Sequence, residues 1–327
     1  MTSGARKAGH GKWLGALLAA VLASLATVAG ASVVVLEPPA NSVAMQTAEQ
    51  TFLNEFTSDS TNPRLMTLDW SRLSAPERLA RLNKDVTLVV TFGVDAATEV
   101  LHTLPEHKVM VLFARRADLE RLRAKWPGRL TGITLDQPYR RLFALARVLS
   151  PDGHAGILLG PETAPWLSAD LERAAYTAER PLNLLRLRPG DSPLRLFERL
   201  LLGSSVVLAV PDPAAYTNQS LQNQMLTAFR HRVPVVGHSE QMADAGALVA
   251  LYSDPVRLGR QGARLAKQAL SGMPPVEDPE DFALVVNYQV ARNLGLAQAS
   301  EGVLRDALVR ADREYLDRSP REPRRTP

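Results

Sequence analysis

Short aliphatic runs alternate with longer amphipathic runs along most of the chain, and this alternation constrains the fold more than any other feature. SVVVLEP at 32–38, VTLVVTFG at 86–93 and KVMVLFA at 108–114 are continuous apolar runs of strand length, with residues of helical spacing between them. Strands that are apolar throughout are buried on both faces, and the helices between them carry the chain back to the same edge of the sheet. The pattern predicts parallel α/β sheets that helices cover on both sides.

The same pattern starts again at residue 129. RLTGITL at 129–135, HAGILLG at 154–160, SVVLAVP at 205–211 and VPVVG at 233–237 are strand candidates of a second series. Two series of about 100 residues each, a common domain size, indicate two similar lobes rather than one long sheet. The elements after residue 247 are too few for a third lobe, so we assign them as additions to the two lobes. Residues 313–327 are charged and interrupted by prolines, which predicts a disordered tail.

The first 31 residues have the organisation of a secretory signal peptide. Three basic residues precede an apolar stretch, and Ala29-Gly30-Ala31 is an A-x-A cleavage site. We expect cleavage there, with an uncleaved membrane anchor as the alternative. Removal of this segment lowers the formal net charge from +4 to +1. A charge so small gives no reason to expect a nucleic-acid partner.

The chain contains no cysteine. Disulfides, thiolate metal sites, a cysteine nucleophile and a lipid anchor on an N-terminal cysteine are therefore excluded. With the signal peptide, this composition predicts a soluble protein of the periplasm that is not a lipoprotein.

Polar residues gather in the loops that follow the predicted strands. In parallel α/β sheets these loops line the ligand crevice, and the helices after them point their positive ends at it. If two lobes face each other, such loops converge on one cleft. The candidate ligand-binding residues in these loops are Glu37, Asn41, Thr91, Gly93, Ala96, Asp136, Gln137, Glu162, Thr163, Asp212, Tyr216, Ser239 and Glu240.

For three of these candidates, a purely structural role is an alternative to ligand binding. Asp212 either accepts a hydrogen bond from a ligand or caps a turn, and Asp136 either contacts a ligand or caps the following helix. Tyr216 either stacks on a ligand or covers its own loop. The sequence leaves these alternatives open.

Two further groups suggest an anionic ligand. Thr91, Gly93 and Ala96 lie in a glycine turn that runs into a helix, whose backbone N–H groups suit a carboxylate, although a plain turn has the same sequence. Arg115 and Arg116 either hold an anion or form a solvated helix face.

No catalytic or cofactor motif is present in the positions that such motifs require. The sequence has no glycine-rich nucleotide motif after a strand, and Gly203-Ser204-Ser205 precedes a strand, whereas a nucleophile elbow follows one. The histidine pairs lack metal-ligand spacing. We therefore predict that the protein is not an enzyme and uses no cofactor or metal.

The chain resembles a known family over Thr131 to Leu296. TGITLDQPYRRLFALARVLS, PDPAAYTNQSLQNQMLTAFRHRVPVVGHSEQ and a closing N-x-x-x-A-x-x-L-G pattern at 287–295 are similar to the periplasmic substrate-binding proteins of ABC transporters, with a type I periplasmic-binding fold. Family members often carry an Asp-Pro pair after the fourth strand, where this chain has Arg115 and Arg116. That departure leaves the class of ligand open.

The resemblance implies two Rossmann-like lobes with parallel sheets, joined by a hinge of three crossings. It places residues 32–132 and about 253–279 in the first lobe, and 133–250 and about 280–300 in the second. It also implies closure of the lobes on a small molecule, delivery to an ABC permease in the membrane and a monomeric state. Some relatives bind aromatic amino acids, so an amino-acid-like ligand is one expectation. The alternatives are a sensing module of the same fold that signals to a membrane receptor or kinase, and an enzyme on a doubly wound fold.

Overall fold

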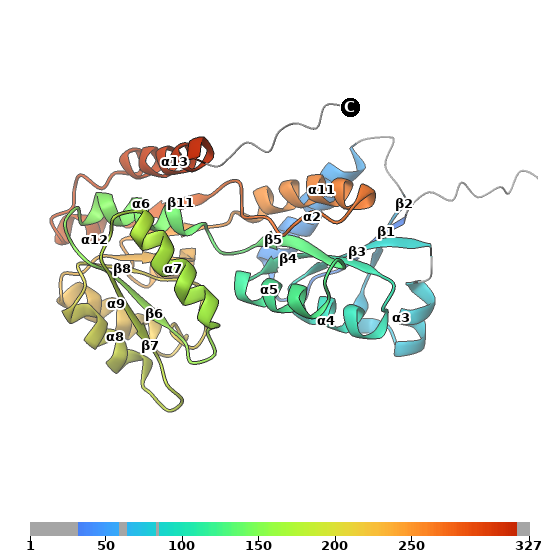
Figure 1. Cartoon of the computed structure of the whole chain (residues 1–327), viewed down its shortest axis with the longest axis horizontal. Coiled ribbons are helices and arrows are strands. Elements are labelled where there is room, and N and C mark those ends of the chain that lie inside the picture. Colours follow the sequence, from blue (N-terminus) through green and yellow to red (C-terminus); the bar gives the residue numbers. More distant parts are fainter. Residues whose placement is uncertain (1–31, 59–63, 83–84, 319–327) are drawn as a thin grey trace, which may run out of the picture.

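Two α/β lobes lie side by side in the structure, a computed structural model that describes residues 32–58, 64–82 and 85–318 (Figure 1). The predicted signal peptide at 1–31 and residues 319–327 of the predicted tail lie outside the described residues. Each lobe is built on one sheet, of five strands in the first lobe and six in the second. The predicted α/β fold with two largely parallel sheets is confirmed.

The first lobe contains a parallel sheet in the order β2-β1-β3-β4-β5. Its strands are β1 (Ser32–Leu36), β2 (Arg64–Leu68), β3 (Val86–Phe92), β4 (Lys108–Ala114) and β5 (Leu130–Thr134). Its helices are α2 (Val43–Thr57), the 3-10 helix η2 (Trp70–Arg72), α3 (Ala75–Arg81), α4 (Val94–Thr103), α5 (Arg116–Lys125) and, from later in the chain, α11 (Pro255–Ser271).

The second lobe contains a sheet in the order β11-β10-β9-β8-β6-β7, in which only the pair of β10 and β11 is antiparallel. Its strands are β6 (Ala155–Leu159), β7 (Leu182–Arg186), β8 (Val206–Leu208), β9 (Val235–Gly237), β10 (Val249–Tyr252) and β11 (Ala283–Val286). Its helices are α6 (Tyr139–Leu149), α7 (Pro165–Thr177), α8 (Pro193–Leu202), α9 (Leu221–Arg230), α10 (Glu240–Asp244), α12 (Tyr288–Asn293) and α13 (Glu301–Arg318).

Both sheets are buried on both faces, as the uninterrupted apolar strands predict. In β1, Val34 belongs to an apolar core that includes residues of α4 and α5, while Val33 and Val35 belong to a second core that includes residues of α2 and α11. Burial of each such side chain contributes about 1.5–3 kcal/mol. The core therefore fixes the two sheets, and with them the positions of the loops at the strand ends.

Helix α11 brings the chain back from the second lobe to the first and packs against α2 (Figure 1). A side chain at Gly259 of α11 would overlap the backbone carbonyl oxygen of Ala48 in α2. The two helices thus approach each other more closely than a residue with a Cβ allows.

The chain passes between the lobes three times. It crosses between β5 and α6, between β10 and α11, and between α11 and β11. Before the third crossing, Glu277 pairs with β5 in the first lobe: its N–H donates to the Gly132 carbonyl at 2.9 Å, and the Thr134 N–H donates to the Glu277 carbonyl at 3.0 Å.

Two details differ from the sequence prediction. The strand expected to begin the second series, β5, completes the first sheet by pairing with β4, so residues 133–134 stay in the first lobe. Residues 313–318, expected to be disordered, continue helix α13, whose Leu304, Ala307 and Leu308 are buried. The charged composition did not indicate this helix, because the partners of Asp312, immediately before that region, lie on the distant helix α6.

Among the described residues, no helix has the length and apolar character that would let it cross a membrane.

Candidate functional site

The strand order of each sheet defines one point where a ligand crevice is expected. In the first sheet the order reverses between β1 and β3, and in the second between β6 and β8. Ligands of open α/β sheets bind outside the carboxyl ends of the strands at such switch points. Nine of the thirteen predicted residues lie at the carboxyl ends of these four strands. Thr91 is near the end of β3 itself, and the other eight follow a strand: Glu37, Asn41, Gly93, Ala96, Glu162, Thr163, Asp212 and Tyr216.

At the first switch point, Gly93 forms the turn from β3 into α4. Its φ angle is +88°, in the region that favours glycine, and its N–H donates to the Leu112 carbonyl at 2.7 Å. The fully buried Thr91 donates its hydroxyl to the Gly93 carbonyl at 3.3 Å. No side chain among the described residues caps α4. The N–H groups of its first turn, which includes the half-buried Ala96, are thus left for solvent or for an anionic ligand group.

The loop after β1 borders the same switch point. Glu37 and Asn41 are exposed there, and the charge of Glu37 acts on Glu49 of α2. Partial burial, and secondly the charge of Glu37, raises the pKa of Glu49 to about 7. A carboxyl group beside the first switch point therefore changes charge near neutral pH.

At the second switch point, Asp212 holds two loops together. Its Oδ2 accepts from the Gly160 N–H at 2.8 Å and from the Thr163 hydroxyl at 2.7 Å. Its Oδ1 accepts from the N–H groups of Ala214 at 3.0 Å and Ala215 at 3.3 Å. These four donors occupy both carboxylate oxygens, so the geometry favours the turn-capping reading of Asp212. Glu162, on the same loop, is exposed.

Tyr216 lies inside the second lobe. Its side chain is 9% exposed, and its ring packs edge-on against Phe197 and His238, with centroid distances of 6.4 Å and 6.1 Å. Its hydroxyl has no hydrogen-bond partner among the described residues, and burial raises its pKa. This arrangement favours the structural role for Tyr216, in which its ring packs under its own loop.

Ser239 and Glu240 follow β9, one strand away from the second switch point. Ser239 is half-buried and makes no side-chain cap on α10, and Glu240 is exposed. Burial, and then the negative charge of Glu240, raises the pKa of the Tyr252 hydroxyl. These two residues thus follow the strand next to β8, and neither joins the hydrogen bonds that Asp212 accepts.

Asp136 and Gln137 lie in the first crossing and are 5% exposed each. The Asp136 carboxylate accepts from the Arg116 N–H at 2.7 Å, which caps α5 of the first lobe, and burial raises the pKa of Asp136. Gln137 donates to the Ser253 hydroxyl of the second crossing at 2.8 Å. Both residues therefore join parts of the hinge.

A cavity of about 10 Å³ lies beside Asp136, Gln137, Tyr139 and His238. This volume suffices for about one water molecule. Burial lowers the pKa of His238 and thus favours its neutral imidazole. The cavity is polar on one side and too small for a solute.

The sequence reasoning missed the residue at the centre of the hinge, Arg141. Its side chain is 2% exposed, and its guanidinium donates to the Gln137 side chain at 2.7 Å and to the Asp312 carboxylate of α13 at 2.7 Å. It also donates to the carbonyl oxygens of Pro279 at 3.1 Å and Glu280 at 2.6 Å, in the third crossing. One signal was available: Arg141 occupies the same helix face as the buried Leu145 and Leu149.

Asp278 connects the lobes through charge. It forms an ion pair with Arg116 of the first lobe and lies 3.8 Å from Nη1 of Arg140 in the second. Arg140 is held from the other side by Asp312 at 2.8 Å. Arg116, predicted either as an anion clamp or as a solvated residue, is thus a hinge residue that contacts the third crossing.

Comparison with known proteins supports the sequence resemblance. Residues 201–310 match the family model described as ABC transporter substrate binding protein. No curated protein matches the chain significantly.

Solved structures with the same fold cover most of the chain. A domain from Streptococcus pneumonia crystallised with L-Trp has a TM-score of 0.56 at 15% identity, over 84% of this chain and 98% of that chain. A ligand-free, open substrate-binding protein with adhesive properties from Clostridium difficile has a TM-score of 0.62 at 12% identity, over 83% and 97%. A transcriptional activator of the comK gene from Bacillus halodurans has a TM-score of 0.51 at 12% identity, over 88% and 98%.

These comparisons confirm the predicted resemblance and the two-lobed type I periplasmic-binding fold. At these identities the structural matches show the fold alone. Together with the family model, they support a ligand-binding protein.

Proposed function

We propose that the protein is the extracytoplasmic solute-binding component of an ABC importer, and that it captures a small molecule between its two switch points by closure of the hinge. The observation that carries the proposal is the placement of polar loops at both switch points, on two sheets joined by three crossings. A ligand that contacts both sets of loops only when the lobes are close shifts the equilibrium towards the closed form.

The first lobe provides the polar end of the proposed site. The uncapped N-terminus of α4, after Gly93, offers N–H groups and a positive helix end to a carboxylate or similar group. Glu37 and Asn41 on the neighbouring loop are exposed and offer side-chain oxygens and an amide to other polar groups of the ligand. An amino-acid-like ligand, with one carboxylate and one ammonium group, fits this combination.

The second lobe provides Glu162 and the loop that Asp212 fixes. Since Asp212 is occupied by four donors, we assign it a positioning role: it holds the Gly160–Thr163 loop in place. Exposed Glu162 on that loop is the residue that we propose faces the ligand.

A thermal-shift screen of the purified protein against amino acids, nucleosides, sugars, small acids and vitamins tests ligand binding. A ligand at 100 times its Kd stabilises the folded state by about 2.7 kcal/mol. Asn41→Ala and Glu162→Gln should weaken the binding of any solute found, whereas Asn223→Ala and Glu172→Gln, on exposed faces of α9 and α7, should not. Equal effects of the two pairs would contradict the proposed site.

Hinge closure is measurable because the natural chain has no cysteine. Fluorophores on Thr103→Cys in the first lobe and Gln222→Cys in the second, both exposed positions, would report the distance between the lobes by energy transfer. We expect the distance to change when the solute is added. A bound solute without any change would refute the closure mechanism, and unchanged high-affinity uptake of that solute in cells lacking the gene would refute the importer role.

A further inference from the structure

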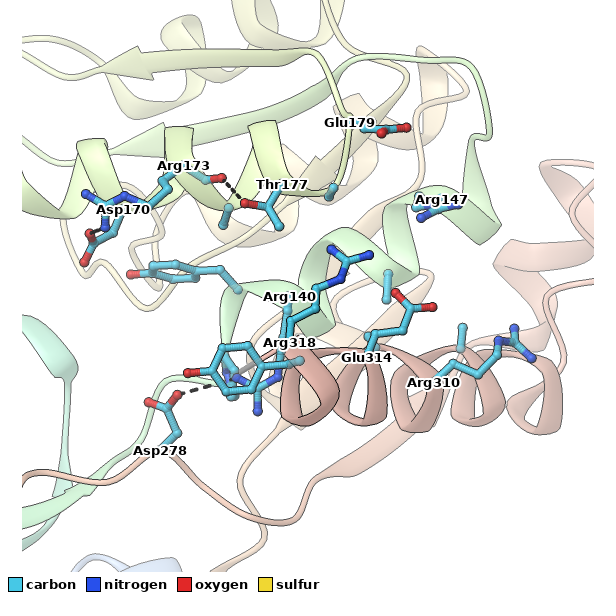
Figure 2. Close-up of a pocket in the computed structure, with 18 of the residues that line it drawn as sticks. Arg140, Arg147, Asp170, Arg173, Thr177, Glu179, Asp278, Arg310, Glu314 and Arg318 are labelled. Carbon is cyan, nitrogen blue, oxygen red and sulfur yellow. Dashed lines mark hydrogen bonds and ion pairs between the residues drawn. The ribbon is translucent and has the colours of Figure 1, made fainter. Parts of the chain in front are cut away.

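A groove of about 820 Å³ lies between α6, α7 and α13, away from both switch points (Figure 2). It starts at the hinge, beside Arg116 and Asp278, and continues to Arg147 at the far end of α6. Pockets of about 300–1,000 Å³ hold small-molecule ligands. The volume of this groove thus suits such a ligand.

Arginines dominate the charged lining of the groove. Six come from α5, α6, α7 and α13: Arg116, Arg140, Arg147, Arg173, Arg310 and Arg318. Only four carboxylates line the same space: Asp170, Glu179, Asp278 and Glu314. Figure 2 shows labelled charged side chains of α6, α7 and α13 around one common space. The lining therefore has more positive than negative groups.

Half of these arginines have no ion pair among the described residues. Arg116 pairs with Asp278, Arg173 with Asp170 and Arg140 with Asp312. No carboxylate in the described part of the chain lies within ion-pair distance of the other three, which are Arg147, Arg310 and Arg318.

The concave shape of the groove increases the positive electrostatic potential that these arginines produce. A concave surface lined by charges of one sign concentrates the potential and attracts counter-ions. Guanidinium groups match carboxylate and phosphoryl oxygens in pairs, which makes arginine the usual residue for polyanion recognition. At the hinge end, the Arg140 guanidinium lies 4.3 Å from the ring centroid of Tyr315, a contact that helps to hold its position.

We propose that this groove binds a small polyanion with two or more carboxylate or phosphoryl groups, at a site separate from the one between the switch points. Arg147 of α6 and Arg310 of α13 hold one end of the anion. Arg140 and Arg116 reach the other end at the hinge, where the anion competes with Asp278. Because Arg116 belongs to the first lobe, occupancy of the groove depends on how the lobes are oriented.

Calorimetric titration of the purified full chain in low-salt buffer tests the proposal, with citrate as the carboxylate probe and pyrophosphate as the phosphoryl probe. Arg147→Gln combined with Arg310→Gln should weaken binding on the order of tenfold or more. Arg195→Gln combined with Arg199→Gln makes the same change in charge on exposed positions of α8 and should leave the affinity unchanged. Glu314→Gln, which removes an exposed carboxylate from the groove, should strengthen binding about twofold to fivefold.

The two probes distinguish the chemistry: tighter binding of citrate indicates a polycarboxylate ligand, and tighter binding of pyrophosphate a phosphorylated one. Failure of both probes to bind, or equal losses in the α6/α13 and α8 double variants, would overturn the proposal. These outcomes are independent of the solute screen, since none of the four arginines lies in a switch-point loop.

Discussion

Replacement of Arg141 by methionine should destabilise the protein more than any exposed change on the same helix. Arg141 is 2% exposed, and its guanidinium makes hydrogen bonds to the Gln137 side chain, to the Asp312 carboxylate and to the carbonyl oxygens of Pro279, Glu280 and Asp281. Methionine retains much of the length and packing of the side chain but none of its donors.

The magnitude follows from the partners that lose a donor. Hydrogen bonds from a charged group contribute about 1.5–3 kcal/mol each, and removal of one member of a buried ion pair costs about 3–5 kcal/mol. Asp312 keeps its contact with Arg140 at 2.8 Å, which limits the loss on that side. We therefore expect the free energy of unfolding to fall by about 3–5 kcal/mol.

Urea denaturation followed by circular dichroism measures this change, with Arg147→Met as the matched control. Arg147 is exposed on the same helix and forms no ion pair within the described residues, so its substitution should change stability by less than about 0.5 kcal/mol. Hydrogen exchange should also accelerate at residues 135–138 and 278–282. A loss below about 1 kcal/mol, or one equal to that of the control, would refute the claim that this network holds the hinge.

Three further changes test other parts of the structure. Gly259→Ala places a Cβ against the Ala48 carbonyl oxygen, so we expect about 1–3 kcal/mol of destabilisation in urea melts from the separation of α11 and α2. Gly93→Ala forces alanine to a φ of 88° and a ψ of 172°, a conformation essentially restricted to glycine, and should cost about 1–3 kcal/mol in the same assay. Glu49 has a pKa of about 7 in the folded state, against 4.5 as its ordinary value, so the folded state binds its proton more tightly. Its contribution to stability is fully present below pH 4.5 and is lost as the pH rises towards 7, and Glu49→Gln should remove this part of the pH dependence of the melting temperature.

Two of these changes, Gly259→Ala and Glu49→Gln, have a matched control within the chain. Gly302 lies in α13 with nothing near its Cβ position, so Gly302→Ala should be neutral or stabilising, and a loss there equal to that of Gly259→Ala would remove the steric explanation. Glu55→Gln changes an exposed carboxylate on the same helix as Glu49. It should leave the pH dependence of the melting temperature between pH 4.5 and 7 as it is in the natural protein. If Glu49→Gln leaves the pH dependence of the melting temperature unchanged, the assigned contribution of Glu49 to stability is refuted.

Local sequence patterns were sufficient to predict the strands of both lobes and the residues at the strand ends. Apolar runs such as 86–93 and 205–211 identify buried parallel strands because both faces of such a strand must meet other elements. The same logic predicted nine candidate residues at strand ends, and the fold places them beside the two switch points. A strand-end position is a local property, so the sequence is enough to find it.

The roles of those residues depended on contacts between distant segments. From the sequence, Asp212 fits a ligand contact and a turn cap equally well. The structure favours the cap, because the N–H of Gly160, 52 residues earlier in the chain, donates to its carboxylate. The sequence predicts Gln137 in a polar loop and Arg141 at a polar helix start. In the structure both are buried where the three crossings meet.

The amino-acid sequence by itself determined the two-series α/β fold, the edge of each sheet that carries polar loops and the family that the chain resembles, because these follow from periodicity and residue type. Only the tertiary structure decided which carboxylates are already occupied, where the hinge is held and that α13 closes one side of an arginine-lined groove. Hydrogen bonds and ion pairs between residues more than a hundred positions apart, such as Arg141 and Asp312, leave no periodic signal. They exist only once the packed core has brought their helices together.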